Sequence, residues 1–137
     1  MVLDVDKIIY YGRYYSFEDE TNENLWWFNR DDLEVYSTQK LIDEYSFNNI
    51  DEIVLSDRYI RLFKTDIITV EKSFMCQYYP RYAIMVLENS RKNDYDISFK
   101  TFIDENNLTR EWFEYEKAKL LEDAIDWCNE NAIIFYE

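Results

Sequence analysis

The sequence contains no histidine, one glycine, one proline and two cysteines. Without histidine the chain cannot build a Ser-His-Asp triad, a Cys-His pair or a histidine metal site, and it lacks the commonest general base near neutral pH. A single glycine excludes the phosphate-binding loop and the dinucleotide-binding fingerprint, because both need several glycines for close backbone approach. We therefore expect a protein that is not an enzyme and that carries no cofactor and no metal.

The cysteines and the apolar runs are equally sparse. Cys76 and Cys128 stand far apart without metal-ligand spacing, so we expect each to fill core volume as a small apolar residue. No apolar run approaches the ~20 residues needed to span a bilayer. The N-terminal stretch "MVLDVDKIIYYGRYY" shows no cleavable apolar segment. These features predict a cytoplasmic protein that does not bind membranes.

Apolar and aromatic residues are plentiful instead. Of the 137 residues, 47% are hydrophobic and 19% aromatic, enough for one domain over residues 1–137 with a buried core. Few glycines favour helices and polar loops over many short hairpins. The expected fold class is α+β: mostly helical, with one small antiparallel hairpin or sheet and a long amphipathic C-terminal helix.

The formal net charge of −14 is unevenly distributed along the chain. Residues 1–57 carry −10, residues 58–100 carry +3, and residues 101–137 carry −7. A surplus of this size disfavours nucleic-acid backbones and anionic membranes, since both require Lys or Arg. We expect a protein partner with a basic surface and no direct nucleic-acid binding, while the oligomeric state is left open.

The N-terminal half shows one clear hairpin pattern. Leu25–Phe28 and Leu33–Ser37 read as two strands joined by a turn at 29–32, with one of the adjacent Trp26 and Trp27 entering the core. The stretch "LDVDKIIYYGRYYSFEDE" fits a helix capped by Asp4 or Asp6, which we favour, or alternatively a strand. The stretch "DEIVLSD" fits a buried strand or an extended connector.

Several helices are expected after the hairpin. We predict one capped by Ser37 or Thr38, one capped by Thr65 or Asp66, one that follows Pro80, and one capped by Asp96.

The last helix begins, on this reading, with Thr109 as N-cap and a hydrophobic staple between Leu108 and Phe113. Its apolar stripe comprises Phe113, Leu120, Leu121, Ala124, Trp127 and Cys128. The final "AIIFYE" is an apolar tail or a short strand.

The polar side of this last helix is the first candidate for partner binding. Glu122, Asp126 and Glu130 are four residues apart, and like charges at this spacing destabilise a helix slightly. Their presence is explained either by a role in partner binding or by an organism whose proteins are generally acidic. On the helical wheel, Trp112 and Tyr115 fall beside these acids and Lys119, where they cover a neighbouring element or meet a partner. The partner-binding set from this side is Trp112, Tyr115, Lys119, Glu122, Asp126 and Glu130.

Other charged stretches have simpler readings. Glu18, Asp19 and Glu20 join the partner-binding set. Together with Glu23 they could also bind Ca²⁺ or Mg²⁺, and so could the separate pair Asp31 and Asp32. A calcium loop needs alternating ligands and a central glycine, so solvated loops are favoured. The basic stretch "RYIRLFK" is expected to pair with acids of the chain itself.

Three segments near the C-terminus carry a family pattern: "FKTFIDENNL", "EWFEYEK" and "LLEDAIDWCNENAI". They resemble a family of small acidic bacterial proteins of uncharacterised function, whose members end with a Phe-Lys helix, a Trp-aromatic pair after a Leu, and an Ala-x-x-Trp segment. The front half departs from the pattern, since Asp32-Leu33 replaces a Thr-Gly turn and "EIVLSD" lacks a proline. The resemblance implies an α+β fold and no particular activity.

Three functions fit these observations. The first is a non-catalytic regulator or adaptor that binds a protein through acidic surface patches. The second is an inhibitor that imitates nucleic acid, of the anti-defence, anti-CRISPR, antitoxin or immunity type. The third, the least favoured, is a carboxylate-based enzyme or metal binder, which would require carboxyls with raised pKa values converging in an apolar pocket.

Overall fold

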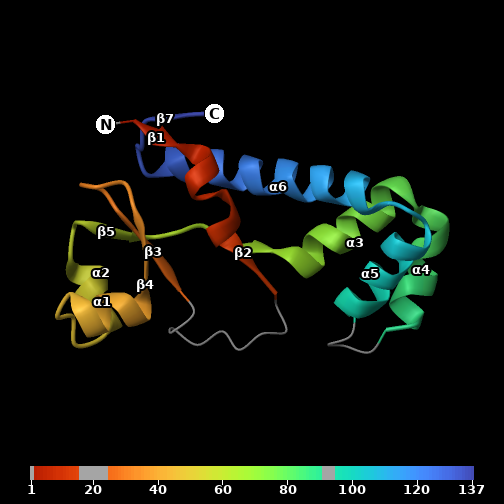
Figure 1. Cartoon of the computed structure of the whole chain (residues 1–137), viewed down its shortest axis with the longest axis horizontal. Helices are drawn as coiled ribbons and strands as arrows, with labels where there is room; N and C mark the ends of the chain where they lie inside the picture. Colours follow the sequence, from red (N-terminus) through yellow and green to blue (C-terminus); the bar gives the residue numbers. More distant parts are fainter. Residues whose placement is uncertain (1, 16–24, 91–94) are drawn as a thin grey trace.

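The computed structural model describes residues 2–15, 25–90 and 95–137 of the chain. It is elongated: a mixed end and a helical end are joined by the long helix α6, which runs along both (Figure 1). The fold is α+β and mostly helical, as predicted. The strands are β1 (Leu3–Asp4), β2 (Arg13–Tyr14), β3 (Trp26–Asn29), β4 (Val35–Ser37), β5 (Tyr59–Arg61), β6 (Thr65–Asp66) and β7 (Phe135–Tyr136). The helices are α1 (Thr38–Glu44), α2 (Ile50–Leu55), α3 (Ile67–Tyr78), α4 (Pro80–Glu88), α5 (Tyr95–Glu105) and α6 (Thr109–Glu130).

The predicted hairpin forms strands β3 and β4, and β5 pairs with the other edge of β3 to give an antiparallel sheet of order β4-β3-β5. The Asn29 side chain accepts the backbone N–H groups of Asp31 and Asp32, which closes the turn. Trp27 is buried and donates its indole N–H to Thr38, as expected for one of the two tryptophans. Trp26 lies at the surface, edge-on against Tyr11.

Residues 2–15 form neither the one helix nor the one strand that the pattern predicted, and the rest of that stretch lies outside the described residues. Two short 3₁₀ helices, Val5–Lys7 and Ile9–Gly12, lie between β1 and β2, and the Asp4 carboxylate caps the first by accepting the N–H of Asp6. Gly12 allows the backbone of this segment to pack closely against Phe63, because an added Cβ would lie 2.2 Å from a carbon of the Phe63 ring. The "AIIFYE" tail does form a strand, β7, which pairs in parallel with β1.

Two helix caps were predicted correctly. Ser37 caps α1 by accepting the N–H of Lys40, and Asp66 caps α3 by accepting the N–H of Ile68. Pro80 occupies the first turn of α4, as its position before that helix indicated.

The strand or connector predicted over "DEIVLSD" was wrong, because residues 50–55 form α2. Asn49 accepts the N–H of Glu52, while the Glu52 carboxylate accepts the N–H of Asn48. These bonds resemble a capping box, which satisfies free N–H groups at a helix start and so favours the helix over a strand here.

Predictions at the last two helix starts also need correction. Asp96 lies inside the first turn of α5 rather than capping it, and forms an ion pair with Lys100. Helix α6 does begin at Thr109, but its N-cap is Leu108 and makes no side-chain cap bond. The staple is absent because Leu108 is buried whereas Phe113 is 59% exposed. Leu108 instead closes the turn after α5, donating its N–H to the carbonyl of Ile103.

Three clusters of buried residues form the core. One lies among α3, α4, α5 and the start of α6; the second packs β1 and the first 3₁₀ helix against the end of α6; the third fills the space between the sheet and α1 and α2. Cys128 belongs to the second cluster, as expected, but Cys76 is exposed on α3, so the prediction for Cys76 was wrong.

Candidate functional site

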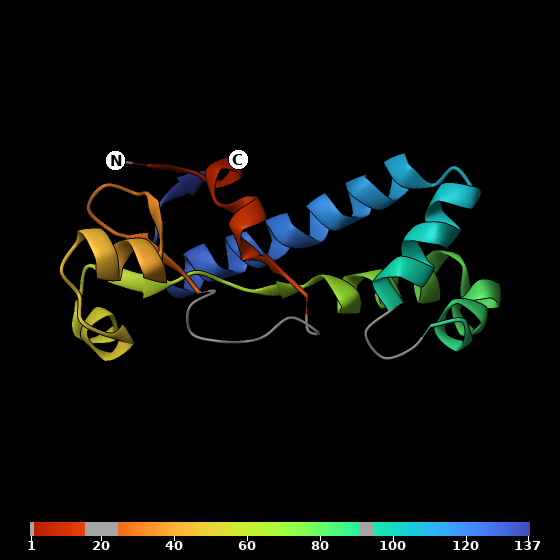
Figure 2. The same ribbon diagram turned by 60° about the horizontal axis from the view of Figure 1, so that its bottom comes forward.

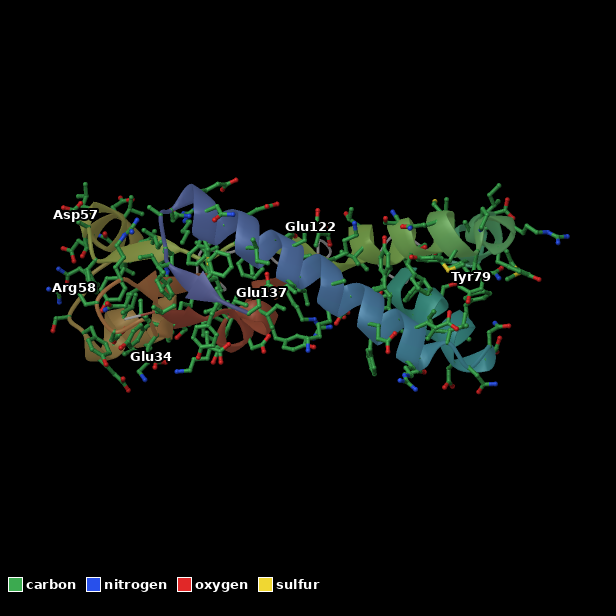
Figure 3. All side chains as sticks on the ribbon, turned by 90° about the horizontal axis from the view of Figure 1, so that it is seen from above. Glu34, Asp57, Arg58, Tyr79, Glu122 and Glu137 are labelled. Carbon is green, nitrogen blue, oxygen red and sulfur yellow. The ribbon has the colours of Figure 1, made fainter. Side chains whose placement is uncertain are left out.

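The polar side of α6 exposes the acids that the sequence singled out. Glu122, Asp126 and Glu130 are exposed, and Lys119 is partly exposed with its ammonium 3.8 Å from the Glu122 carboxylate. Figure 3 shows Glu122 near the middle of the molecule, between its two ends. We call Lys119, Glu122, Asp126 and Glu130 the α6 acidic face. By the rise of a helix, its three acids follow one another at about 6 Å along the axis.

Of the aromatic members of the predicted set, Trp112 is buried and Tyr115 is half-buried at the edge of the same core cluster. Trp112 is 1% exposed and packs against Phe74 and Phe99, with ring centroids 5.6 and 4.7 Å away. The Tyr115 hydroxyl lies 2.8 Å from that of Ser73 and donates to the Gln77 amide, which ties it to α3. Of the two alternatives for these rings, the structure therefore places them over neighbouring helices.

The second predicted acidic set, Glu18, Asp19 and Glu20, lies outside the described residues, so its role stays a prediction. In the hairpin turn, Asp31 pairs with Arg58 at 2.8 Å and Asp32 accepts the Tyr36 hydroxyl. The turn carboxylates thus have partners within the chain.

The cations of the basic stretch "RYIRLFK" contact other residues of this protein. Besides the Arg58 ion pair, the Arg61 guanidinium lies 5.6 Å from the ring centroid of Trp27 and the Lys64 ammonium 5.0 Å from that of Tyr14. Cations held over rings in this way are stabilised by the ring quadrupole. The prediction of pairing with the chain's own acids is met by Arg58, whereas Arg61 and Lys64 use aromatic rings.

Sequence reasoning missed a buried carboxyl cluster in the helical end. Glu71 of α3 is 0% exposed, and neither of its oxygens forms a hydrogen bond of ordinary geometry. Asp96 and Glu116 lie near it; the Lys100 ammonium is 3.3 Å from Asp96, and the Arg13 guanidinium is 3.3 Å from Glu116. We call these five residues, from β2, α3, α5 and α6, the buried charge cluster.

Burial is the main influence on this cluster. It raises the pKa of Glu71 from 4.5 to about 10, and the neighbouring Asp96 carboxyl adds to the shift through its contact and its charge. Burial also raises the pKa of Glu116, although Arg13 and Lys100 oppose the shift. Glu71 is therefore protonated at neutral pH, which leaves the two bases facing the other two carboxyls.

Raised pKa values on neighbouring carboxyls are also a feature of acid–base catalysis. Here the carboxyls are enclosed: Glu116 is only 4% exposed and Glu71 not at all. A hollow of about 560 Å³ between α5 and α6 is lined by Asp96 but by neither glutamate. Within the described residues, no three Cys, Asp or Glu side chains are placed to hold a metal ion. The geometry fits a network that joins the helices better than a site open to substrate.

Comparisons with protein-family models, with curated proteins and with solved structures gave no match to this chain. The resemblance to small acidic bacterial proteins therefore stays a prediction. Among the described residues, no helix is both long enough and apolar enough to cross a bilayer. The function must be inferred from the surfaces of the molecule itself.

Proposed function

We propose that the protein is a non-catalytic regulator or adaptor that binds a basic surface of another protein through the α6 acidic face. The supporting observation is the exposure of three acids at helical spacing, two of which have no ion-pair partner in the described residues. Within the described part of the chain, Asp126 and Glu130 have no ion-pair partner, whereas Glu122 pairs with Lys119 at 3.8 Å at the exposed surface.

The physical argument is electrostatic complementarity. Like charges four residues apart cost a helix a few tenths of a kcal/mol, so their retention on an ordered helix supports a role outside the fold. An acidic surface on a chain of net charge −14 accelerates encounters with basic partners and rejects acidic ones. The partner chemistry that fits is a protein surface rich in Lys and Arg.

The test reverses the charge of the three acids on the α6 acidic face. The triple variant Glu122→Lys, Asp126→Lys, Glu130→Lys should weaken binding of a captured, purified partner at least roughly tenfold, or about 1.4 kcal/mol, because it replaces attraction to a basic surface with repulsion. The matched control reverses three exposed acids elsewhere: Glu34, Asp57 and Glu88. Binding would be measured by calorimetry, after circular dichroism has confirmed that both variants are folded. Equal losses for the two variants would reduce the effect to net charge, and no loss for the α6 variant would contradict the proposal.

Nucleic-acid imitation is the second candidate, supported by the regular spacing of carboxylates on one rigid helix. Under this alternative the captured partner binds duplex DNA or RNA, and the duplex displaces the protein in competition. A regulator of another kind would keep its partner in the presence of excess duplex. The competition experiment therefore separates the two alternatives with the same purified components.

A further inference from the structure

Helix α5 has an uncovered outer side at the helical end of the molecule. Its inner residues Phe99, Phe102 and Ile103 are buried against the neighbouring helices. Its outer residues Ile97, Thr101 and Asp104 recur at helical spacing and are all exposed, Ile97 by 65%. Figure 2 shows α5 running from the side of α4 up to the start of α6.

Two hollows lie on either side of this exposed row. One, between α5 and α6, measures about 560 Å³ and reaches Phe113; the other, between α5 and α4, measures about 510 Å³ and reaches Met85. Ile97, Thr101 and Glu105 line both hollows, so they form a ridge between two grooves. Ridges and grooves of this kind are how one helix accepts another.

The grooves combine apolar walls with acids. Phe113 is 59% exposed and Met85 44%, so three helices each contribute one large apolar side chain beside the ridge. Single exposed apolar residues are common on protein surfaces, but contiguous ones mark interaction sites. We call Met85, Ile97, Thr101, Asp104, Glu105 and Phe113 the α5 docking face.

The charged side chains of this face that have no ion-pair partner in the described residues are all acidic. Lys100 is the one cation that lines either groove, and it is paired with Asp96 at 3.3 Å. Asp104 and Glu105 have no ion-pair partner within the described residues. An occupant must therefore bring apolar side chains for the grooves and Lys or Arg for these two acids.

We propose that the α5 docking face binds a basic amphipathic helix of a partner protein. Apolar residues at i, i+3/i+4 and i+7 of that helix fill the two grooves, and its flanking Lys or Arg side chains reach Asp104 and Glu105. A second copy of this chain fits poorly, because it would bring the same acids face to face. The inference shares with the proposed function only the basic character of the partner, since the α5 docking face is separate from the α6 acidic face.

The probe for a direct test is a synthetic peptide of Leu and Lys arranged as an amphipathic helix, compared with a scrambled peptide of identical composition. The helical peptide should bind the full chain at least roughly tenfold more tightly than the scrambled one, since only the former presents one apolar stripe. Ile97→Asp and Asp104→Lys should each weaken binding of the helical peptide by a similar factor. Fluorescence anisotropy of labelled peptides measures both comparisons.

Matched controls separate this idea from the proposed function. Leu55→Asp changes an apolar residue that is 80% exposed on α2 and should leave peptide affinity unchanged. Losses confined to the Glu122, Asp126, Glu130 triple variant would place the peptide on the α6 acidic face and overturn the docking inference, while leaving the proposed function intact. Equal binding of both peptides, no binding of either, or a dimer that Ile97→Asp dissociates in sedimentation would each overturn the α5 docking inference.

Discussion

At the scale of single residues, Glu71 is the most unusual group in the described structure. It is a carboxyl with no exposed surface, and it lies beside the aromatic and aliphatic core of the helical end together with the rest of the buried charge cluster. Burying a carboxylate without a good partner is costly, so the side chain keeps its proton instead. The neutral acid can then lie beside Asp96 without adding a second negative charge.

The protonation of Glu71 predicts a pH dependence of stability with a definite sign. In the unfolded chain its pKa is near 4.5, whereas in the folded chain it is about 10. Between these values the folded state holds one more proton, so the free energy of unfolding falls as pH rises, by at most about 1.4 kcal/mol per pH unit. The contribution is fully present below the unfolded pKa and is lost as pH approaches the folded one.

Glu71→Gln keeps the size of the side chain and removes this titration. Relative to the natural chain, the variant should gain up to about 2.7 kcal/mol between about pH 6 and about pH 8. Urea unfolding at the two pH values measures the difference, with Glu88→Gln, an exposed glutamate on α4, as the control expected to show no such trend. A constant difference between variant and natural chain across this range would contradict the assignment.

At the scale of elements, helices α5 and α6 end in the same type of turn at their C-termini, but with different residues in the left-handed position. Asn107 has φ 55° after α5 and Ala132 has φ 55° after α6. In each case the next residue donates its N–H five positions back, Leu108 to Ile103 and Ile133 to Cys128. This left-handed position suits Gly or Asn, and Ala is strained there.

Ala132→Gly should therefore stabilise the protein by about 0.5–1 kcal/mol, because glycine adopts the left-handed conformation without the Cβ penalty. Ala118→Gly is the matched control: Ala118 is exposed in the middle of α6, where glycine should cost about 1 kcal/mol. Thermal unfolding of the two variants should shift in opposite directions. Destabilisation by Ala132→Gly would mean that the turn does not form.

Local signals in the sequence predicted the elements that depend on local bonds. Ser37 and Asp66 could be recognised because a cap acts on N–H groups two or three residues away. The hairpin could be recognised because alternation and turn residues stand next to one another. Helix α2 was not predicted because the apolar run 53–55 fits a strand as well as a helix, and only the cap bonds of Asn49 and Glu52 favour the helix.

The buried side of α6 could not be read from an ideal helical wheel. Its fully enclosed residues follow one another at intervals of four: Trp112, Glu116, Leu120, Ala124 and Cys128. Each step of four passes a full turn by about 40°, so the buried side winds around the helix. It winds because α3 and α5 cover the first half of α6, whereas the N-terminal segment covers the second. A straight stripe assigned Phe113 to the core and Trp112 to the surface, the reverse of what the structure shows.

One member of the buried charge cluster, Glu71, could have been recognised from the sequence. Glu71 stands four residues after Ile67 and three before Phe74, at a position of α3 where the apolar pattern requires a buried side chain. A charged residue at such a position indicates either a partner or a shifted pKa. Its partners Arg13, Asp96, Lys100 and Glu116 come from three other elements, so only the tertiary structure could supply them.

At the scale of the whole molecule, α6 joins two of the three core clusters. Trp112 belongs to the cluster at the helical end, and Ala124, Trp127 and Cys128 to the cluster beside β1. Leu120, which is fully buried, lies between them on the same helix. Single domains of fewer than about 150 residues usually unfold in one all-or-none transition, and a helix shared by two clusters fits that behaviour.

We therefore expect one cooperative unfolding transition for the whole chain. Leu120→Ala should lower its stability by about 2–4 kcal/mol without separating the ends, while Leu87→Ala at an exposed site should change it by less than about 0.5 kcal/mol. Far-ultraviolet circular dichroism follows the helices and tryptophan fluorescence follows both clusters. Coincident curves are the expected outcome, and two separated transitions would show that the ends fold independently.

The pairing of β1 with β7 also determines how the molecule would bear a mechanical load. The two strands run in the same direction, with Leu3 opposite Phe135 and Asp4 opposite Tyr136. A force applied before β1 and after β7 therefore pulls the pair lengthwise in opposite directions, so that its hydrogen bonds are sheared together instead of being peeled apart one by one. The hydrogen bonds between β1 and β7 must therefore break before the force acts on α6.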